Sequence, residues 1–130
     1  MNAEMEKAFQ KIFESNTHYV GAPARFLAAW KKAIGLIGPQ YFHSSNLDDY
    51  TQAADKTQLE PNWNAIERRV RTCSVGEGVL IGAVVSFYNP DWGNSILEGF
   101  DYPGLAGVAN RLELQEMKVV TELMMNYTGW

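Results

Sequence analysis

The sequence predicts an all-α domain, a compact bundle of about five main helices and one short helix around a buried apolar central helix. Along several segments apolar residues recur at spacings of three and four, which is the periodicity of an amphipathic helix. The chain has 130 residues, of which 46% are hydrophobic, and a chain of this length buries enough surface to fold without a disulfide or a structural metal. We therefore expect residues 1–130 to form a single globular domain.

The composition excludes several classes of protein. The 15 acidic and 11 basic side chains give a formal net charge of −4, whereas proteins that bind nucleic acid neutralise phosphates with clustered lysines and arginines. The single cysteine cannot form an intramolecular disulfide, which fits a reducing compartment or one whose redox state does not matter to the fold. Residues 1–13 lack the apolar stretch of a secretory signal, and the most apolar run, residues 75–88, is shorter than the roughly 20 residues of a membrane span. We expect a cytoplasmic protein that binds neither nucleic acid nor membrane.

The first 37 residues are expected to form two helices. The first covers Ala3 to Glu14 and is closed by Ser15 and Asn16. Its apolar face consists of Met5, Phe9, Ile12 and Phe13. After a loop over residues 17–21, the second helix begins at Pro23, because proline suits a first-turn position where its missing N–H has no partner to lose. The Gly-Pro pair at 38–39 ends this helix.

Residues 40–60 form the least regular segment. Ser45 followed by Asp48 resembles a helix cap, which predicts one short helix from Leu47 to Ala54. A clearer helix begins after the Glu-Pro-Asn triplet at 60–62. Its apolar residues, at spacings of three and four, are Trp63, Ile66, Val70 and Cys73.

Residues 75–88 are expected to form the central helix, although two structures fit them. Most of their side chains favour strands, so the alternative is a hairpin over residues 68–88, which would make the fold α+β. Ser74 followed by Glu77 resembles a capping box, and Asn89-Pro90 supplies a stop. The run is also longer than most strands. We therefore favour the helix, and its nearly complete apolar surface places it at the centre.

A row of small residues marks this central helix. Gly78, Gly82 and Ser86 recur at every fourth position, which lets another backbone approach closely. That backbone belongs either to another helix of the same chain or to a second copy in a homo-oligomer.

The remaining residues are expected to form a loop and a final helix. Residues 91–104 are rich in glycine and aromatic side chains, which predicts a loop with one short turn near Ser95. The final helix begins at Leu105 or Asn110 and runs to about Tyr127, with a broad apolar stripe that offers a second place for an oligomer seam.

Candidates for chemistry are few. His43 with Asp48 and Asp49 is the one local cluster of ionisable residues, and its spacing matches no metal signature. We therefore expect no metal and no cofactor, and an enzyme that uses His43 with Asp48 or Asp49 is the third hypothesis. Cys73 lies on an apolar stripe, where a thiol has low reactivity, and Glu77 is expected to cap its helix.

Aromatic side chains in the irregular segments support a second hypothesis. Such residues either anchor loops on the core or line a ligand pocket. An acidic-rimmed pocket would bind a small cationic or polar aromatic molecule. Its lining would be Tyr41, His43, Asp48, Asp49, Tyr88, Trp92 and Tyr102.

The leading hypothesis is a non-catalytic function. Because no catalytic motif is present in the sequence, we expect a homo-oligomeric interaction or adaptor module. Its seam would use the last helix or the row formed by Gly78, Gly82 and Ser86.

Overall fold

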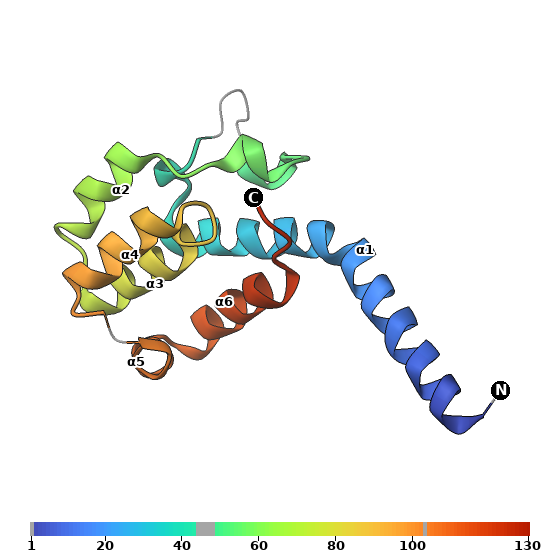
Figure 1. The fold of residues 1–130 in the computed structure, drawn as a ribbon. Coiled ribbons are helices and arrows are strands. Elements are labelled where there is room, and N and C mark those ends of the chain that lie inside the picture. The colour runs from blue at the N-terminus through green and yellow to red at the C-terminus, as the bar shows by residue number, and fades with distance from the viewer. Residues whose placement is uncertain (1, 44–48, 103) are drawn as a thin grey trace.

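The computed structural model describes residues 2–43, 49–102 and 104–130, and these residues form an all-α fold with no strand. The predicted fold class is confirmed. The hairpin alternative over residues 68–88 is wrong, since this segment contains the end of one helix, a turn and a second helix (Figure 1). The α-helices are α1 (Ala3–Ile37), α2 (Trp63–Val70), α3 (Val75–Val85), α4 (Pro90–Gly99), α5 (Gly104–Arg111) and α6 (Leu114–Asn126).

Helix α1 corrects the prediction of two helices in the first 37 residues. It is a single helix of 35 residues, so neither the expected end at Ser15 and Asn16 nor the loop over residues 17–21 is present. Polar residues such as Ser15 lower helix propensity only slightly, and a helix already formed on either side continues through them. Pro23 lies inside the helix rather than at its start. Proline removes one backbone hydrogen bond and bends a helix, and Figure 1 shows α1 bent near this residue.

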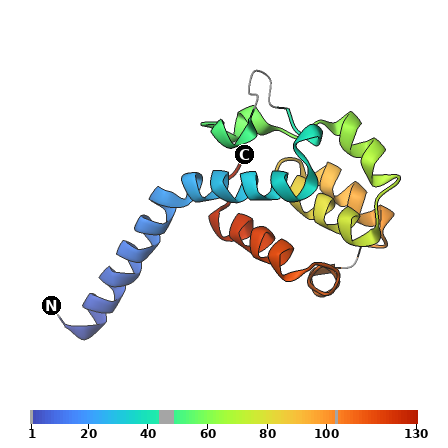
Figure 2. The ribbon, with the colours of Figure 1, turned by 180° about the vertical axis from the view of Figure 1, so that it is seen from behind.

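The bend divides α1 into two parts. We call residues 3–20 the arm and residues 22–37 the body half. The arm projects away from the other helices in both ribbon views (Figures 1 and 2). None of the described residues 3–20 is buried. All six buried residues of α1 belong to the body half, and they are Ala22, Phe26, Ala29, Trp30, Ala33 and Ile34.

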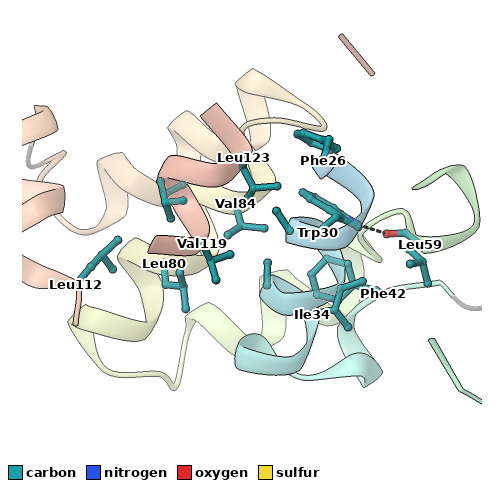
Figure 3. Packing of buried hydrophobic residues seen from close by; sticks show 14 of the residues in the cluster. Phe26, Trp30, Ile34, Phe42, Leu59, Leu80, Val84, Leu112, Val119 and Leu123 are labelled. Carbon is teal, nitrogen blue, oxygen red and sulfur yellow. Dashed lines mark hydrogen bonds between the residues drawn. The ribbon is translucent and has the colours of Figure 1, made fainter. Parts of the chain in front are cut away.

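The core forms where the body half, α3 and α6 meet (Figure 3). Trp30 is fully buried at its centre, and its indole N–H donates a hydrogen bond of 2.9 Å to the carbonyl of Leu59. Helix α3 is buried at every residue from Gly78 to Val85, as expected for an apolar central helix. Ser74 caps it by accepting a hydrogen bond from the backbone N–H of Glu77.

Helix α4 replaces most of the loop predicted over residues 91–104. Asn89 and Pro90, which were expected to end the preceding helix, begin this one. The Asn89 side chain accepts a hydrogen bond from the N–H of Trp92, and Pro90 occupies the first turn. The pair is therefore a start signal as well as a stop signal.

The last helix is also divided differently from the prediction. Two helices, α5 and α6, occupy the expected span, and the buried Leu112 lies between them. Glu113 and Glu116 form a capping box that begins α6. In the middle of the chain, the described part of the predicted helix at 47–54 contains a short 3-10 helix, Tyr50–Gln52. Other 3-10 helices cover Pro39–Tyr41 and Lys56–Leu59. Ser45, Leu47 and Asp48 lie outside the described residues.

Candidate functional site

The residues predicted to line an aromatic pocket are placed in different surroundings. Tyr88 and Trp92 are in contact, with ring centroids 5.5 Å apart, and Trp92 also stacks on Trp63 at 4.8 Å. The Tyr88 hydroxyl donates a hydrogen bond to a Glu60 carboxylate oxygen at 3.3 Å. Burial, together with the charge of Glu60, raises the pKa of Tyr88. These rings pack on the core and anchor the loop that follows α3.

The other members of that predicted set are more dispersed. Tyr41 is partly buried against the core, His43 is exposed and Tyr102 is 54% exposed. The Asp49 carboxylate accepts a hydrogen bond from the N–H of Thr51, and this bond lowers the pKa of Asp49. Asp48 lies outside the described residues. Among the described members, Tyr88 and Trp92 are the two that the structure brings into ring contact.

The surroundings of Cys73 and Glu77 are typical of residues that support the fold. Cys73 follows the end of α2 in a turn and is partly buried, and burial raises the pKa of its thiol. The Glu77 carboxylate forms an ion pair with Arg69, so it does not reach back to Ser74 as a complete capping box would require. Among the described residues, no group of three or more His, Cys, Asp or Glu side chains could hold a metal ion.

The row of small residues on α3 packs against α4 of the same chain. A Cβ atom on Gly78 would overlap the ring of Phe100, and one on Gly82 would lie 2.9 Å from Leu97. Ser86 meets a glycine in turn, since a Cβ on Gly93 would lie 2.5 Å from its Cα. The close approach that the row predicted is therefore made within one chain, and a second copy could reach the row only if α4 moved away.

The arm carries a broad apolar face that the described chain leaves in solvent. Each of its six large apolar side chains is more than half exposed, and these are Met5, Phe9, Ile12, Phe13, Tyr19 and Val20. Monomeric soluble proteins rarely expose contiguous apolar patches larger than a few hundred Å², and larger patches mark interaction surfaces or ligand-binding grooves. The arm is therefore the main candidate functional site, which the sequence alone did not single out.

A cap and two acidic side chains at the first turn support the arm as an ordered helix. Asn2 caps its first turn by accepting a hydrogen bond from the N–H of Met5, and Glu4 and Glu6 lie near the positive end of the helix dipole. The base of the arm is tied to α6, because the His18 ring lies 2.8 Å from the carbonyl of Met125. The direction of the arm relative to the body is thus fixed by contacts on one side of the bend.

A hollow of about 330 Å³ lies where the arm joins the body. The hollow is lined by residues of the body half of α1, of the segment at 54–56 and of the C-terminal segment. They are Pro23, Ala24, Phe26, Leu27, Ala54, Asp55, Lys56 and Thr128. Lys56 Nζ lies 5.2 Å from the centroid of the Phe26 ring and 5.0 Å from that of Trp130. The lysine also donates a hydrogen bond to the carbonyl of Gly129. One wall of the hollow is therefore held in place by a cation between two aromatic rings.

Comparison of the chain with protein-family models, curated proteins and solved structures gave no match. Within the described ranges, none of the helices combines the length and the apolar character needed to span a bilayer. The function is therefore inferred from the arm, the hollow and the contacts around them.

Proposed function

We propose that the protein is a homo-oligomeric interaction module in which the arm associates with a second copy of the chain. One observation carries the proposal. The apolar face of α1 is covered by the chain's own core in the body half, whereas the arm exposes six large apolar side chains to solvent. The interaction surface is thus the arm, in place of the row on α3 or the last helix.

The spacing on the arm supports pairing with another helix. Its central row consists of Met5, Phe9, Ile12, Asn16 and Tyr19, which alternate at intervals of four and three residues. This is the heptad pattern by which α-helices pack along one another. Asn16 is the polar member of the row, and a single buried Asn in such a seam fixes the register of like helices at a cost in stability. A second copy supplies the matching Asn side chain.

The exposed area is sufficient for a stable pair. An aromatic side chain buries roughly 150–250 Å², so Phe9, Phe13 and Tyr19 leave roughly 350 Å² uncovered at their observed exposure. With the three aliphatic side chains the total reaches roughly 700 Å², close to the ~800 Å² that each partner contributes to a standard interface. Two arms that cover each other would therefore remove most of the apolar surface of this face from water.

Phe9→Glu tests the proposal. Size-exclusion chromatography with light scattering, over a concentration series, should give twice the chain mass for the wild type and the chain mass for Phe9→Glu. A charge in the centre of a helix seam is strongly disfavoured unless it is paired. Gln10→Glu is the matched control, because it adds the same charge to the polar face of the arm. It should remain dimeric.

The body must stay folded in both variants for the comparison to hold. Residue 9 is exposed and lies in the arm, so far-ultraviolet circular dichroism and thermal unfolding of Phe9→Glu should match those of wild type at concentrations where both are monomeric. A wild-type protein that stays monomeric at its highest soluble concentration, or a Phe9→Glu protein that still dimerises, would contradict the proposal.

A further inference from the structure

We propose that the hollow is the seat for the N-terminal turn of the partner's arm, so that two copies exchange arms in antiparallel orientation about a two-fold axis. This inference rests on the proposed self-association and adds its partner surface and its geometry. Three observations carry it: the course of the apolar face along α1, the direction of the bend, and the charges at the two ends.

The apolar face of the arm leads directly into the hollow. Successive residues of an α-helix are rotated by about 100°, so residues three and four apart share one face. Pro23 follows Tyr19 at an interval of four, and Leu27 follows Pro23 at the same interval. Pro23 and Leu27 both line the hollow. A helix that lies on the exposed face of the arm and continues past the bend therefore reaches the hollow.

The bend of α1 opens the space in which such a helix would end. In Figures 1 and 2 the arm bends toward the side on which α6 lies, and the segment that contains Lys56–Leu59 lies on the opposite side of α1. A straight partner helix on that opposite side separates from α1 beyond Pro23. The gap is bounded by α1 and by Ala54 and Lys56, which are walls of the hollow.

The orientation follows from where the end of the partner's arm would lie. If the two Asn16 side chains meet at the two-fold axis, Met5 of one copy lies opposite Leu27 of the other, because each is 11 residues from Asn16. At a rise of about 1.5 Å per residue this is about 16 Å along the helix. Met5 then enters a hollow of about 330 Å³, and the flexible thioether of methionine fills irregular apolar gaps well. A parallel pair would leave both hollows empty.

The charges at the two ends favour the same orientation. The first turn of the arm carries Glu4 and Glu6. The hollow has Lys56 at its wall, and Lys31, one turn beyond Leu27, lies at the nearby loop, where its ammonium donates to the carbonyl of Thr51. The antiparallel pair brings the acids of one copy to the lysines of the other, whereas a parallel pair would place the acids side by side.

Asp55, which also lines the hollow, opposes this charge pattern in part. Its carboxylate accepts a hydrogen bond of 2.8 Å from the N–H of Thr57, and this bond lowers the pKa of Asp55. The carboxylate therefore stays charged beside Lys56, and Asp49 likewise lies near Lys31. The antiparallel orientation is thus favoured because it separates the two acidic first turns, and not by an excess of positive charge at the hollow.

Thiol crosslinking tests the orientation. In a Cys73→Ser background, Met5→Cys and Leu27→Cys proteins are prepared separately, mixed and treated with a short flexible bis-maleimide, so that a mixed link can form only between copies. A disulfide requires Cα atoms roughly 4.4–6.8 Å apart, whereas the crosslinker tolerates the gap that opens beyond Pro23. The antiparallel pair should give the mixed Met5–Leu27 dimer in preference to either self-linked product. A Met5→Cys protein that preferentially links to itself would show a parallel pair and overturn the inference.

Blocking the hollow separates this inference from the proposed function. Ala54→Trp fills the hollow with a large ring from an exposed position, and it should raise the dimer dissociation constant by about tenfold or more. The matched control is Ala28→Trp, at an exposed position of α1 on the side that faces α6, which should leave dimerisation unchanged. If Phe9→Glu abolishes the dimer but Ala54→Trp does not weaken it and no Met5–Leu27 link forms, the arm associates elsewhere and the hollow is not its seat.

Discussion

The two halves of α1 share an apolar spacing but lie in opposite environments. In the body half, Phe26 and Trp30 are at most 2% exposed, whereas in the arm Phe9 and Ile12 are more than 60% exposed. One uninterrupted helix therefore carries an apolar face that the chain covers on one side of Pro23 and leaves in solvent on the other. Amphipathic spacing therefore determines which face of a helix is apolar, but not which chain covers it.

The body half also explains why the arm is helical without a covering layer. An isolated helix is costly to begin in water, because the first turn fixes several residues for a single hydrogen bond. The arm continues a helix that the core already holds, so it needs no nucleus of its own. Its cap at Asn2 and the hydrogen bond between Gln10 and Glu14 add local support. The arm can thus present a preformed seam to a partner.

Truncation of Trp30 gives the largest expected contrast between the two halves. Trp30→Ala should lower the free energy of unfolding by about 3–5 kcal/mol, because it leaves a cavity in the core and removes the hydrogen bond to Leu59. Phe13→Ala in the arm should change the free energy of unfolding of the monomer by less than about 0.5 kcal/mol while weakening the dimer. Urea unfolding followed by circular dichroism, at concentrations that keep wild type monomeric, measures both. Equal losses would show that the arm face packs on the body.

Gly78→Ala should give an intermediate effect confined to the body. The new methyl group would meet the ring of Phe100, and overpacking of this kind costs about 1–3 kcal/mol. Thermal unfolding should show the loss, while light scattering should show an unchanged dimer mass. Gly99→Ala is the control, since its added methyl meets nothing within 4 Å. A Gly78→Ala protein with normal stability that no longer dimerises would show that the row on α3 forms the dimer seam.

Local signals were sufficient for the fold class and for the central helix. Ser74 supplies a cap just before a long apolar run, and such a run must be central in a small domain. The close approach predicted for Gly78 and Gly82 is likewise present, against α4. These features were predictable because each depends on residues next to one another in the sequence or on one face of one helix.

The helix boundaries and the site depend on more than local sequence. Asn89-Pro90 ends one helix and begins the next with the same chemistry, so the sequence did not reveal α4. Ser15 and Asn16 resemble a helix end, but the helix continues because the body half holds it. Nothing in the spacing of Met5 and Phe9 distinguishes a face covered by the chain's own core from a face in solvent. That distinction comes from the direction of the arm after the bend.

The smallest expected effect concerns the charges at the ends of the exchanged arms. Glu4→Lys with Glu6→Lys should weaken the dimer by up to about fivefold per lost pair, since exposed ion pairs contribute roughly 0.2–1 kcal/mol each. Salt should weaken the wild-type dimer and should have less effect on, or strengthen, the reversed variant, because screening removes attraction in one and repulsion in the other. Sedimentation equilibrium at two salt concentrations measures this. The control Lys118→Glu changes a charge on α6, away from the arm's apolar face. It should leave the dissociation constants at both salt concentrations unchanged. Identical salt dependence in wild type and the reversed variant would mean that the acidic turn does not meet the lysines of the hollow.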